Sequence, residues 1–401
     1  MSRLSANGRG PTTPRGWRGP FSLCRLAVGF LAFVLILATA VPLLRSNVWW
    51  IRIFDYPRIQ IASLTALTLA GYVGMRVYAR LRSWEYVLAA LAILAMGWQI
   101  LSLAPYTRLY PHQTSDSSAK DDSNRISMLI YNVRYDSREV EALRDLIRDT
   151  DPDIILLSEP TRWWQQQLAG LEEYYPYTLL QPQENKYGKL LYSRLSLEAP
   201  EIRFMIGSEI PSIRTKVRLR SGTLVTFYGV HPRPPGLHRP EQEQGTGIKK
   251  GDEGDGERED SDMRDAELQL IAREIMDQRN IPVIVAGDFN DVPWSRSFRH
   301  FQRIGGLLDP RVGRGFFNTF SPGNILLRYP LDGALASRHF RLVEIRRLPD
   351  IGSDHFPLLV VLDYDPNASA TNKEPKPDGS DKAESDEAIE EGISNEKRGS
   401  P

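Results

Sequence analysis

The sequence predicts an α+β protein, a four-layer α/β/β/α sandwich preceded by an N-terminal helical transmembrane module. Three observations lead to this prediction. Long apolar runs fill the first hundred residues. The stretch that follows alternates short apolar runs of strand length with patterns of helical period, and closely spaced strand-like runs come after it. Two packed sheets with helices outside them can bury the apolar faces of all these elements.

The first part of the chain divides into a basic segment, residues 1–25, and a membrane module, residues 26–103. Leu26–Leu44 has 19 residues without a charge, Ile59–Met75 is a weaker run, and Tyr86–Leu103 is the third. Each run lies within or near the roughly 17–25 residues that cross a bilayer. We therefore expect three transmembrane helices. A cleaved signal peptide is the competing interpretation of the first run, and a re-entrant or interfacial segment is that of the second.

Positive charge near these runs predicts the orientation. Two segments are rich in arginine. The first precedes the first run and has no acid, with Arg3, Arg9, Arg15, Arg18 and Arg25; the second lies between the second and third runs, with Arg76, Arg80 and Arg82. Cytoplasmic segments of membrane proteins are rich in Lys and Arg. The N-terminus is therefore expected in the cytoplasm. Three spans then place everything after Leu103 outside the cytoplasm, in a multi-pass protein of the cell membrane.

The charge balance argues against a protein whose main task is to grip a polynucleotide. The 50 Lys and Arg residues equal the 50 Asp and Glu residues, whereas binding to nucleic acid of any sequence depends on clustered cations. One local exception is an alternating set of cations: Arg214, Lys216, Arg218 and Arg220. On a strand they share a face, which is either a solvated outer surface or a surface that steers phosphates.

The remaining boundaries follow from composition. Residues 104–125 are a polar linker, and residues 126–365 form the folded domain. Within it, Pro240–Asp260 is rich in Gly, Glu, Asp and Lys without periodicity, so we expect a disordered insertion. Residues 366–401 are acidic and lack aromatic side chains, so we expect a disordered tail. Cys24 is the only cysteine, and the domain therefore relies on its core rather than on disulfides.

Polar side chains stand at the ends of four strand-like runs. Two amide or acid side chains follow such runs singly, Asn132 and Glu159, and two pairs stand beside later runs, Asp288 with Asn290 and Asp354 with His355. Asp288 and Asn290 are two residues apart, so they project to the same side of an extended chain. This set of side chains suits hydrolysis at a phosphate. That reaction uses a metal ligand, an acid that orients water, a neutral donor for the developing charge and a group that transfers a proton.

These motifs resemble the signature of the endonuclease/exonuclease/phosphatase superfamily, in the order Asn132, Glu159, Gly287–Asn290 and Ser353–His355. The resemblance covers residues 126–364. Within the superfamily, this sequence most resembles the bacterial membrane-anchored branches. The resemblance implies metal-dependent hydrolysis of phosphoesters, with the active groups gathered at one edge of a two-sheet sandwich. One departure is Arg134, which stands where some members of the family carry an acid.

The resemblance also implies a role for each residue. Mg²⁺ or Mn²⁺ would be held by the carboxylate of Glu159, by the amide oxygen of Asn132 and by Asp354, since hard cations prefer oxygen ligands. Asp288 and Asn290 would orient the attacking water and the phosphoryl oxygens. His355 would act as general base or electrostatic partner, and the carboxylate of Asp332 would hold its tautomer. His231 would contact the phosphate or act as the leaving-group acid.

The substrate stays open at this point between nucleic acid and a phospholipid headgroup such as that of sphingomyelin. The membrane module holds the domain near lipid, whereas the balanced charge provides no basic groove for a polynucleotide. A rival of another class is a catalytically inactive domain that binds lipid or protein. The bilayer is an expected partner, and no obligate protein partner is evident.

Overall fold

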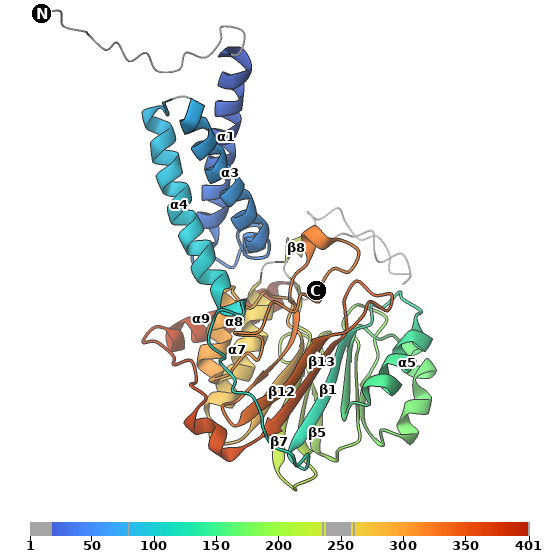
Figure 1. The fold of residues 1–401 in the computed structure, drawn as a ribbon. Helices are drawn as coiled ribbons and strands as arrows, with labels where there is room; N and C mark the ends of the chain where they lie inside the picture. Colours follow the sequence, from blue (N-terminus) through green and yellow to red (C-terminus); the bar gives the residue numbers. More distant parts are fainter. Residues whose placement is uncertain (1–17, 79, 235, 238–257, 260, 400–401) are drawn as a thin grey trace, which may run out of the picture. The chain divides into compact units, whose positions relative to one another are not determined.

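The computed structural model describes residues 18–78, 80–234, 236–237, 258–259 and 261–399. The chain forms two compact units (Figure 1). The first comprises residues up to Ser46 and Pro57–Ala104, and the second comprises Asn47–Tyr56 and everything from Pro105 onward. The expected insertion Pro240–Asp260 lies outside the described residues except for Arg258–Glu259, a short strand β9 that pairs with β8 (Gly236–Leu237).

The first unit contains three long helices, α1 (Arg18–Ala40), α3 (Arg58–Tyr78) and α4 (Ser83–Leu103), which pack against one another. They coincide with the three apolar runs. Among the described residues, two helical segments are long and apolar enough to cross a membrane, Ser22–Leu43 and Ser83–Tyr106. The helix between them, α3, does not reach the same hydropathy.

Helices α1 and α4 run in the same direction. Near their N-terminal ends, Arg25 forms an ion pair with Glu85. Near their C-terminal ends, the Gln99 side-chain amide donates to the Thr39 hydroxyl at 3.0 Å. Contacts at both ends fix the two helices as parallel neighbours, so the chain between them returns to the starting end of α1.

The second unit is built on two mixed sheets. The first has the strand order β12-β13-β1-β2-β4-β3 and the second β11-β10-β7-β6-β5. The first sheet consists of β1 (Arg125–Asn132), β2 (Ile154–Ser158), β3 (Tyr177–Gln181), β4 (Lys189–Ser193), β12 (Phe340–Arg347) and β13 (Leu358–Tyr364). The second consists of β5 (Leu197–Arg203), β6 (Ser212–Arg218), β7 (Leu224–Val230), β10 (Val283–Asp288) and β11 (Asp332–Ala336).

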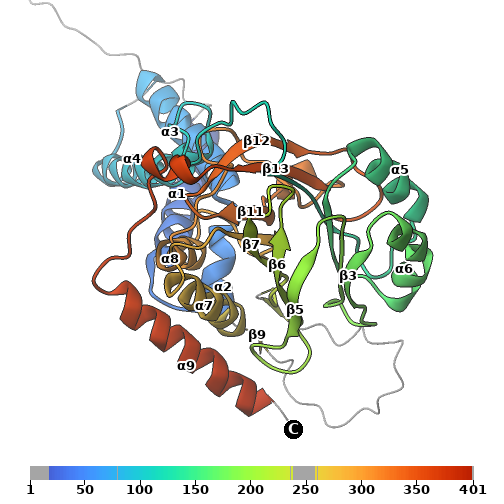
Figure 2. The same ribbon diagram turned by 90° about the horizontal axis from the view of Figure 1, so that it is seen from below.

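Three apolar cores separate four layers, as the sequence predicted. Alternate side chains of β1, such as Met128 and Ile130, pack with Phe227 and Ile284 of the second sheet. The outer face of the first sheet packs on α5 (Val140–Thr150) and α6 (Arg162–Gln167), and that of the second on α7 (Asp262–Met276) and α8 (Arg296–Gly305). Figure 2 shows α5 and α6 on one side of the strands and α7 and α8 on the other. Central strands such as β2 and β10 are therefore buried on both faces, which explains their nearly continuous apolar runs.

The expected disordered tail is wrong for most of its length. Residues 366–370 form a short 3₁₀ turn, and α9 (Asp381–Gly399) packs along α7. Charge complementarity explains the order: Asp381 accepts from Arg303 at 2.6 Å, and Asp386 pairs with Arg273. The acids that suggested a solvated tail thus neutralise basic side chains of α7 and α8, a pairing that composition alone does not reveal.

The expected linker is also partly ordered. Ser117 donates its backbone N–H to the carbonyl of Leu342 at 2.7 Å, which adds this segment to the edge of β12.

The alternating cations lie on β6 and just after it. Three of them are paired: Arg214 with Glu201, Arg218 with Glu198, and Arg220 with Asp153. This pairing favours a structural surface over one that steers phosphates.

Candidate active site

Strand register brings the predicted residues to one edge of the sandwich. Asn132, the last residue of β1, lies opposite Ser158, so Glu159 follows at the same level. In the other sheet, Asp288 lies opposite Asp332, and Gly287 lies opposite Val230, which precedes His231. His355 precedes β13, which runs antiparallel to β1 and pairs Leu358 with Ile130. The topology alone therefore gathers six of the eight predicted side chains.

Asn132 joins the two sheets through its side-chain amide. The amide nitrogen donates to Glu159 Oε1 at 3.0 Å and to Asp288 Oδ2 at 3.1 Å. Its oxygen accepts the backbone N–H of Arg134 at 3.0 Å. The sequence predicted that this oxygen would bind a metal. In the structure the nitrogen faces the two carboxylates and the oxygen accepts the Arg134 N–H, so the amide holds Glu159 and Asp288 in place.

Asp288 occupies the centre of the site. Its Oδ2 lies 3.6 Å from His231 Nε2 and 3.7 Å from His355 Nε2, and its Oδ1 accepts the backbone N–H of Asn290 at 2.9 Å. Gly287 allows the backbone before Asp288 to approach β7 closely, because a Cβ at residue 287 would lie 2.0 Å from the carbonyl oxygen of Val230. The glycine of the Gly-Asp-Phe-Asn motif is thus required by the close approach of β7.

His355 is held by the buried carboxylate of Asp332. Its Nδ1 lies 2.7 Å from Asp332 Oδ2, which leaves Nε2 directed towards Asp288. Asp332 is fixed in turn by its backbone N–H, which donates to the Thr319 hydroxyl at 3.0 Å. This bond sets the orientation of the imidazole, as in other carboxylate–histidine pairs.

Burial and charge shift the pKa values of three site residues in different directions. Burial raises the pKa of Glu159 to about 7, and the charges of Asp354 and Asp288 add to the rise. Burial lowers the pKa of His231 to about 3, so its imidazole is neutral at physiological pH. Burial by itself would lower the pKa of His355, but the charges of Asp332 and Asp288 raise it to about 10. One histidine is therefore neutral and the other protonated at pH 7.

The donor set fits a hard divalent cation. Glu159, Asp354 and Asp288 place three carboxylates close enough that the charges of the other two raise the pKa of the first. Such a cluster of negative charge is costly without a counter-ion, and Mg²⁺ or Mn²⁺ prefers carboxylate oxygens. Asp288, Asp332 and His355 also place their ligand atoms within 4.8 Å of one another. The hydrogen bond between Asp332 and His355 favours an acid–base pair at that end of the site.

Two loop residues in the left-handed region shape the site. Glu159 has φ 63° and Asn290 has φ 48°, conformations that are uncommon outside glycine and concentrate at functional sites. The Asn290 amide nitrogen donates to the carbonyl of Pro232 at 2.9 Å. Asp354 follows Ser353, whose hydroxyl donates to the Asn132 carbonyl at 2.7 Å. All eight predicted residues thus lie at this edge.

Lys189, a fully buried lysine at the start of β4, was not among the predicted site residues. Burial lowers its pKa to about 7, while the charges of Glu267, Asp288 and Asp332 oppose the fall. The signal was present in the sequence, since Lys189 alternates with Leu191 and Ser193 and therefore faces the space between the sheets. Tyr56 and Arg264 were also not among the predicted site residues, and their contacts with the loop after β10 cannot be read from sequence spacing.

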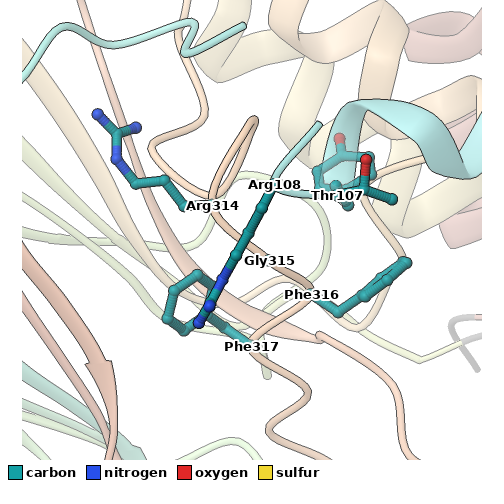
Figure 3. A pocket seen from close by; sticks show the side chains of 7 residues that line it. Thr107, Arg108, Arg314, Gly315, Phe316 and Phe317 are labelled. Atoms are coloured by element: carbon teal, nitrogen blue, oxygen red, sulfur yellow. The ribbon is translucent and has the colours of Figure 1, made fainter. Parts of the chain in front are cut away.

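A separate hollow of about 360 Å³ lies on the second unit (Figure 3). It is lined by Tyr106, Thr107, Arg108, Arg314, Gly315, Phe316 and Phe317. None of these is a predicted site residue. Arg314 is already paired with Asp116 and donates to two backbone carbonyls. The chemistry of the catalytic edge does not extend to this hollow.

Comparison with known families gives a match over residues 129–355, more than half of the chain, to the Endonuclease/Exonuclease/phosphatase family. The matched range includes all eight predicted site residues. No curated protein matches the chain in sequence.

Solved structures of similar arrangement cover 60% of this chain. Humanized TDP2 of D. rerio is 15% identical, with 99% of its chain covered and a TM-score of 0.43. The human Nocturnin catalytic domain with bound sulfate is 16% identical, with 95% covered and a TM-score of 0.45. An endonuclease/exonuclease/phosphatase family protein from Bacteroides thetaiotaomicron is 17% identical, with 98% covered and a TM-score of 0.44.

Proposed function

Because the chain belongs to the Endonuclease/Exonuclease/phosphatase family of phosphoester hydrolases, we propose that it is a membrane-anchored, divalent-metal-dependent phosphodiesterase with its catalytic domain outside the cytoplasm. The position of Asp288 carries the proposal. It lies within 3.7 Å of His231 and His355 and accepts a hydrogen bond from Asn132. The carboxylate of Asp288, the His355 imidazolium and the neutral Asn132 amide therefore lie together at one place, where a phosphoryl group can react.

The residue roles follow from the charges. Asp288 accepts the proton of the attacking water, because its neighbour His355 is already protonated. The His355 imidazolium then neutralises charge that develops on the phosphoryl oxygens, and Asp332 keeps the ring oriented. This assigns the electrostatic role to His355 rather than that of general base. His231 is a phosphate contact rather than a leaving-group acid, because burial lowers its pKa and its neutral imidazole lacks the second ring proton that an acid would transfer. When the bond between phosphorus and the leaving oxygen breaks, that oxygen takes its proton from solvent water.

Glu159 and Asp354 would hold the divalent cation, with Asn132 orienting the Glu159 carboxylate. Such an ion polarises the phosphoryl group and neutralises its charge. The fit rests on the donor chemistry described above: three clustered carboxylates and a Glu159 pKa of about 7.

Replacing Glu159 with Gln should weaken Mg²⁺ or Mn²⁺ binding by at least roughly tenfold, since the change removes a charged ligand. In the wild type, affinity should rise from pH 6 to pH 8, because the cation competes with the proton on Glu159. Isothermal titration calorimetry measures both effects. The exposed Glu173→Gln variant is the control and should bind normally. Equal affinities for both variants would contradict the assignment.

Two observations support three membrane crossings. Asn47–Tyr56 belongs to the same compact unit as the catalytic domain, so both lie on one side of the bilayer. Helices α1 and α4 are parallel, so a returning pass must lie between them. Helix α3, with 21 residues, is the one described helix between them long enough to make that pass, since it spans about 30 Å.

Alkaline phosphatase, which is active only outside the cytoplasm, should be active when fused after Ser46 or at the C-terminus and inactive after Arg82. The expected pattern follows from three crossings that start in the cytoplasm. Enzyme activity in intact cells measures it. An active fusion after Arg82 would place the catalytic domain in the cytoplasm and redirect the search for a substrate to intracellular phosphoesters.

One feature of the second unit favours a phospholipid headgroup over nucleic acid. The loop that joins Phe320 to Tyr329 carries an apolar tip, Ile325–Leu327, whose side chains are 75%, 71% and 48% exposed. At the base of the loop the Phe320 ring stacks on Tyr329 and meets His355 at 5.2 Å. The apolar tip therefore lies beside the catalytic edge, where it can enter a lipid surface.

Replacing all three tip residues with serine should lower hydrolysis of phospholipid or sphingomyelin vesicles at least roughly tenfold, because the apolar area available to the lipid is lost. Hydrolysis of a soluble chromogenic bis-phosphodiester should be unchanged, and this serves as the internal control. Metal-dependent cleavage of that substrate also excludes an inactive binding module. Equal loss on both substrates would contradict the role of the tip, and activity on DNA or RNA alone would favour the nuclease alternative.

A further inference from the structure

The segment that joins α1 to α3 belongs to the catalytic unit rather than to the helical one. It consists of residues 47–56, including α2 (Trp49–Arg52), and we call it the docking segment. The Ser261 backbone N–H donates to the Asn47 carbonyl at 3.0 Å, and the Trp294 indole donates to the Asp55 carbonyl at 2.7 Å. Both ends of the docking segment are thus tied to the domain that carries the active site.

The last residue of the docking segment reaches a catalytic residue. The Tyr56 hydroxyl donates to the backbone carbonyl of Asn290 at 2.7 Å. Arg264, fully buried at the start of α7, donates to the same carbonyl at 2.9 Å. Burial raises the pKa of the Tyr56 hydroxyl, which therefore stays protonated and remains a donor.

The surroundings keep these two donors in place. Arg264 is paired with Asp265 at 2.9 Å and with Asp291 at 3.3 Å. The Tyr56 ring meets the Tyr329 ring edge-on at 5.6 Å. Neither Tyr56 nor Arg264 touches the reacting groups in the mechanism above, so packing and charge pairing hold them for a different purpose.

Asn290 needs this support because of its backbone. Its φ of 48° lies in the left-handed region, which is strained for a residue other than glycine. Its N–H donates to Asp288 Oδ1 at 2.9 Å, and its side-chain nitrogen donates to Pro232. The backbone of Asn290 links the carbonyl that Tyr56 holds to the N–H that donates to Asp288, so a change in its φ and ψ on loss of the Tyr56 bond would move this N–H relative to Asp288, the proton acceptor.

We propose that Tyr56, a residue of the connection between the first two helices, is a positioning residue that aligns Asn290 and Asp288 for catalysis. The N-terminal module is then more than an anchor, since its first connection completes the active site. The proposal rests on the role proposed above for Asp288 and on the role that the family resemblance implies for Asn290, which is to orient the attacking water and the phosphoryl oxygens. It makes a specific demand: loss of the Tyr56 hydroxyl should impair turnover without impairing substrate or metal binding.

The test is Tyr56→Phe in the full chain in detergent, assayed on a chromogenic bis-phosphodiester with Mn²⁺. We expect kcat to fall roughly tenfold, with KM and the Mn²⁺ affinity within about twofold of wild type, since a small misplacement of reacting groups lowers the rate. The Phe ring keeps its contact with Tyr329, so the variant should fold, which its melting temperature reports.

Tyr106→Phe is the matched control. Tyr106 is also buried, and its hydroxyl donates to a carbonyl of the same loop, that of Pro293, at 3.0 Å. It should lose a similar amount of stability while keeping its kcat. The proposal is overturned if Tyr56→Phe keeps wild-type kcat, or if both variants lose kcat equally. Asn290→Ala separates the two levels: full activity there would refute the proposed role of Asn290 itself.

Discussion

Asp288→Ala and His355→Ala should each lower kcat by roughly two or more orders of magnitude, the size of a lost acid–base or electrostatic group. Both histidines and the Asn132 amide approach the carboxylate of Asp288. Its loss removes the proton acceptor and leaves two imidazoles without their common partner. Steady-state hydrolysis of a chromogenic bis-phosphodiester with Mg²⁺ or Mn²⁺ measures the effect.

Exposed residues of the same types provide the controls. Asp145 on α5 has a side chain that is 66% exposed, and His112 has one that is 42% exposed. Asp145→Ala and His112→Ala should keep wild-type turnover. EDTA should abolish the wild-type activity. Turnover that survives in EDTA, or that is unaffected by Asp288→Ala, would refute the metal-dependent mechanism.

The catalytic edge was predictable from sequence because a residue at the end of a strand has a known place at the edge of the sheet. Each motif residue follows or precedes an apolar run, and the carboxyl ends of parallel neighbours such as β1 and β2 must meet at one edge. Asn132 and Glu159 are adjacent for that reason alone. Their protonation states were not predictable, because they depend on burial: His231 and His355 look alike in sequence but have pKa values of about 3 and about 10.

The elements that sequence reasoning missed are held by contacts between distant segments. Helix α9 was expected to be disordered because its composition is acidic, but its acids pair with arginines of α7 and α8, and Asn395 donates to Asp262 at 2.8 Å. The docking segment was assigned to the membrane module because it lies between two apolar runs. Its contacts with Ser261, Asn290 and Trp294 are more than 200 residues away in the chain, and no local pattern predicts them.

Those contacts determine how the catalytic domain can be isolated. A chain that begins at Pro105 lacks the docking segment, so Arg264 and Asn290 lose the Tyr56 hydroxyl, Trp294 loses its acceptor, and Ser297 loses the Arg52 guanidinium that donates to it at 2.5 Å. Each buried hydrogen bond contributes about 1 kcal/mol. For a domain of this size, several such losses lower the melting temperature by on the order of 10 °C.

We therefore expect the chain that begins at Pro105 to melt well below the full chain and to hydrolyse the chromogenic substrate more slowly. A chain that begins at Asn47 keeps the docking segment, α3 and α4, and lacks only residues 1–46, which include α1. It should retain most of the stability and activity. Differential scanning calorimetry in the same detergent compares the three chains. If the chain that begins at Pro105 melted with the full chain, the docking segment would be a passive connection and the catalytic unit would be complete without it.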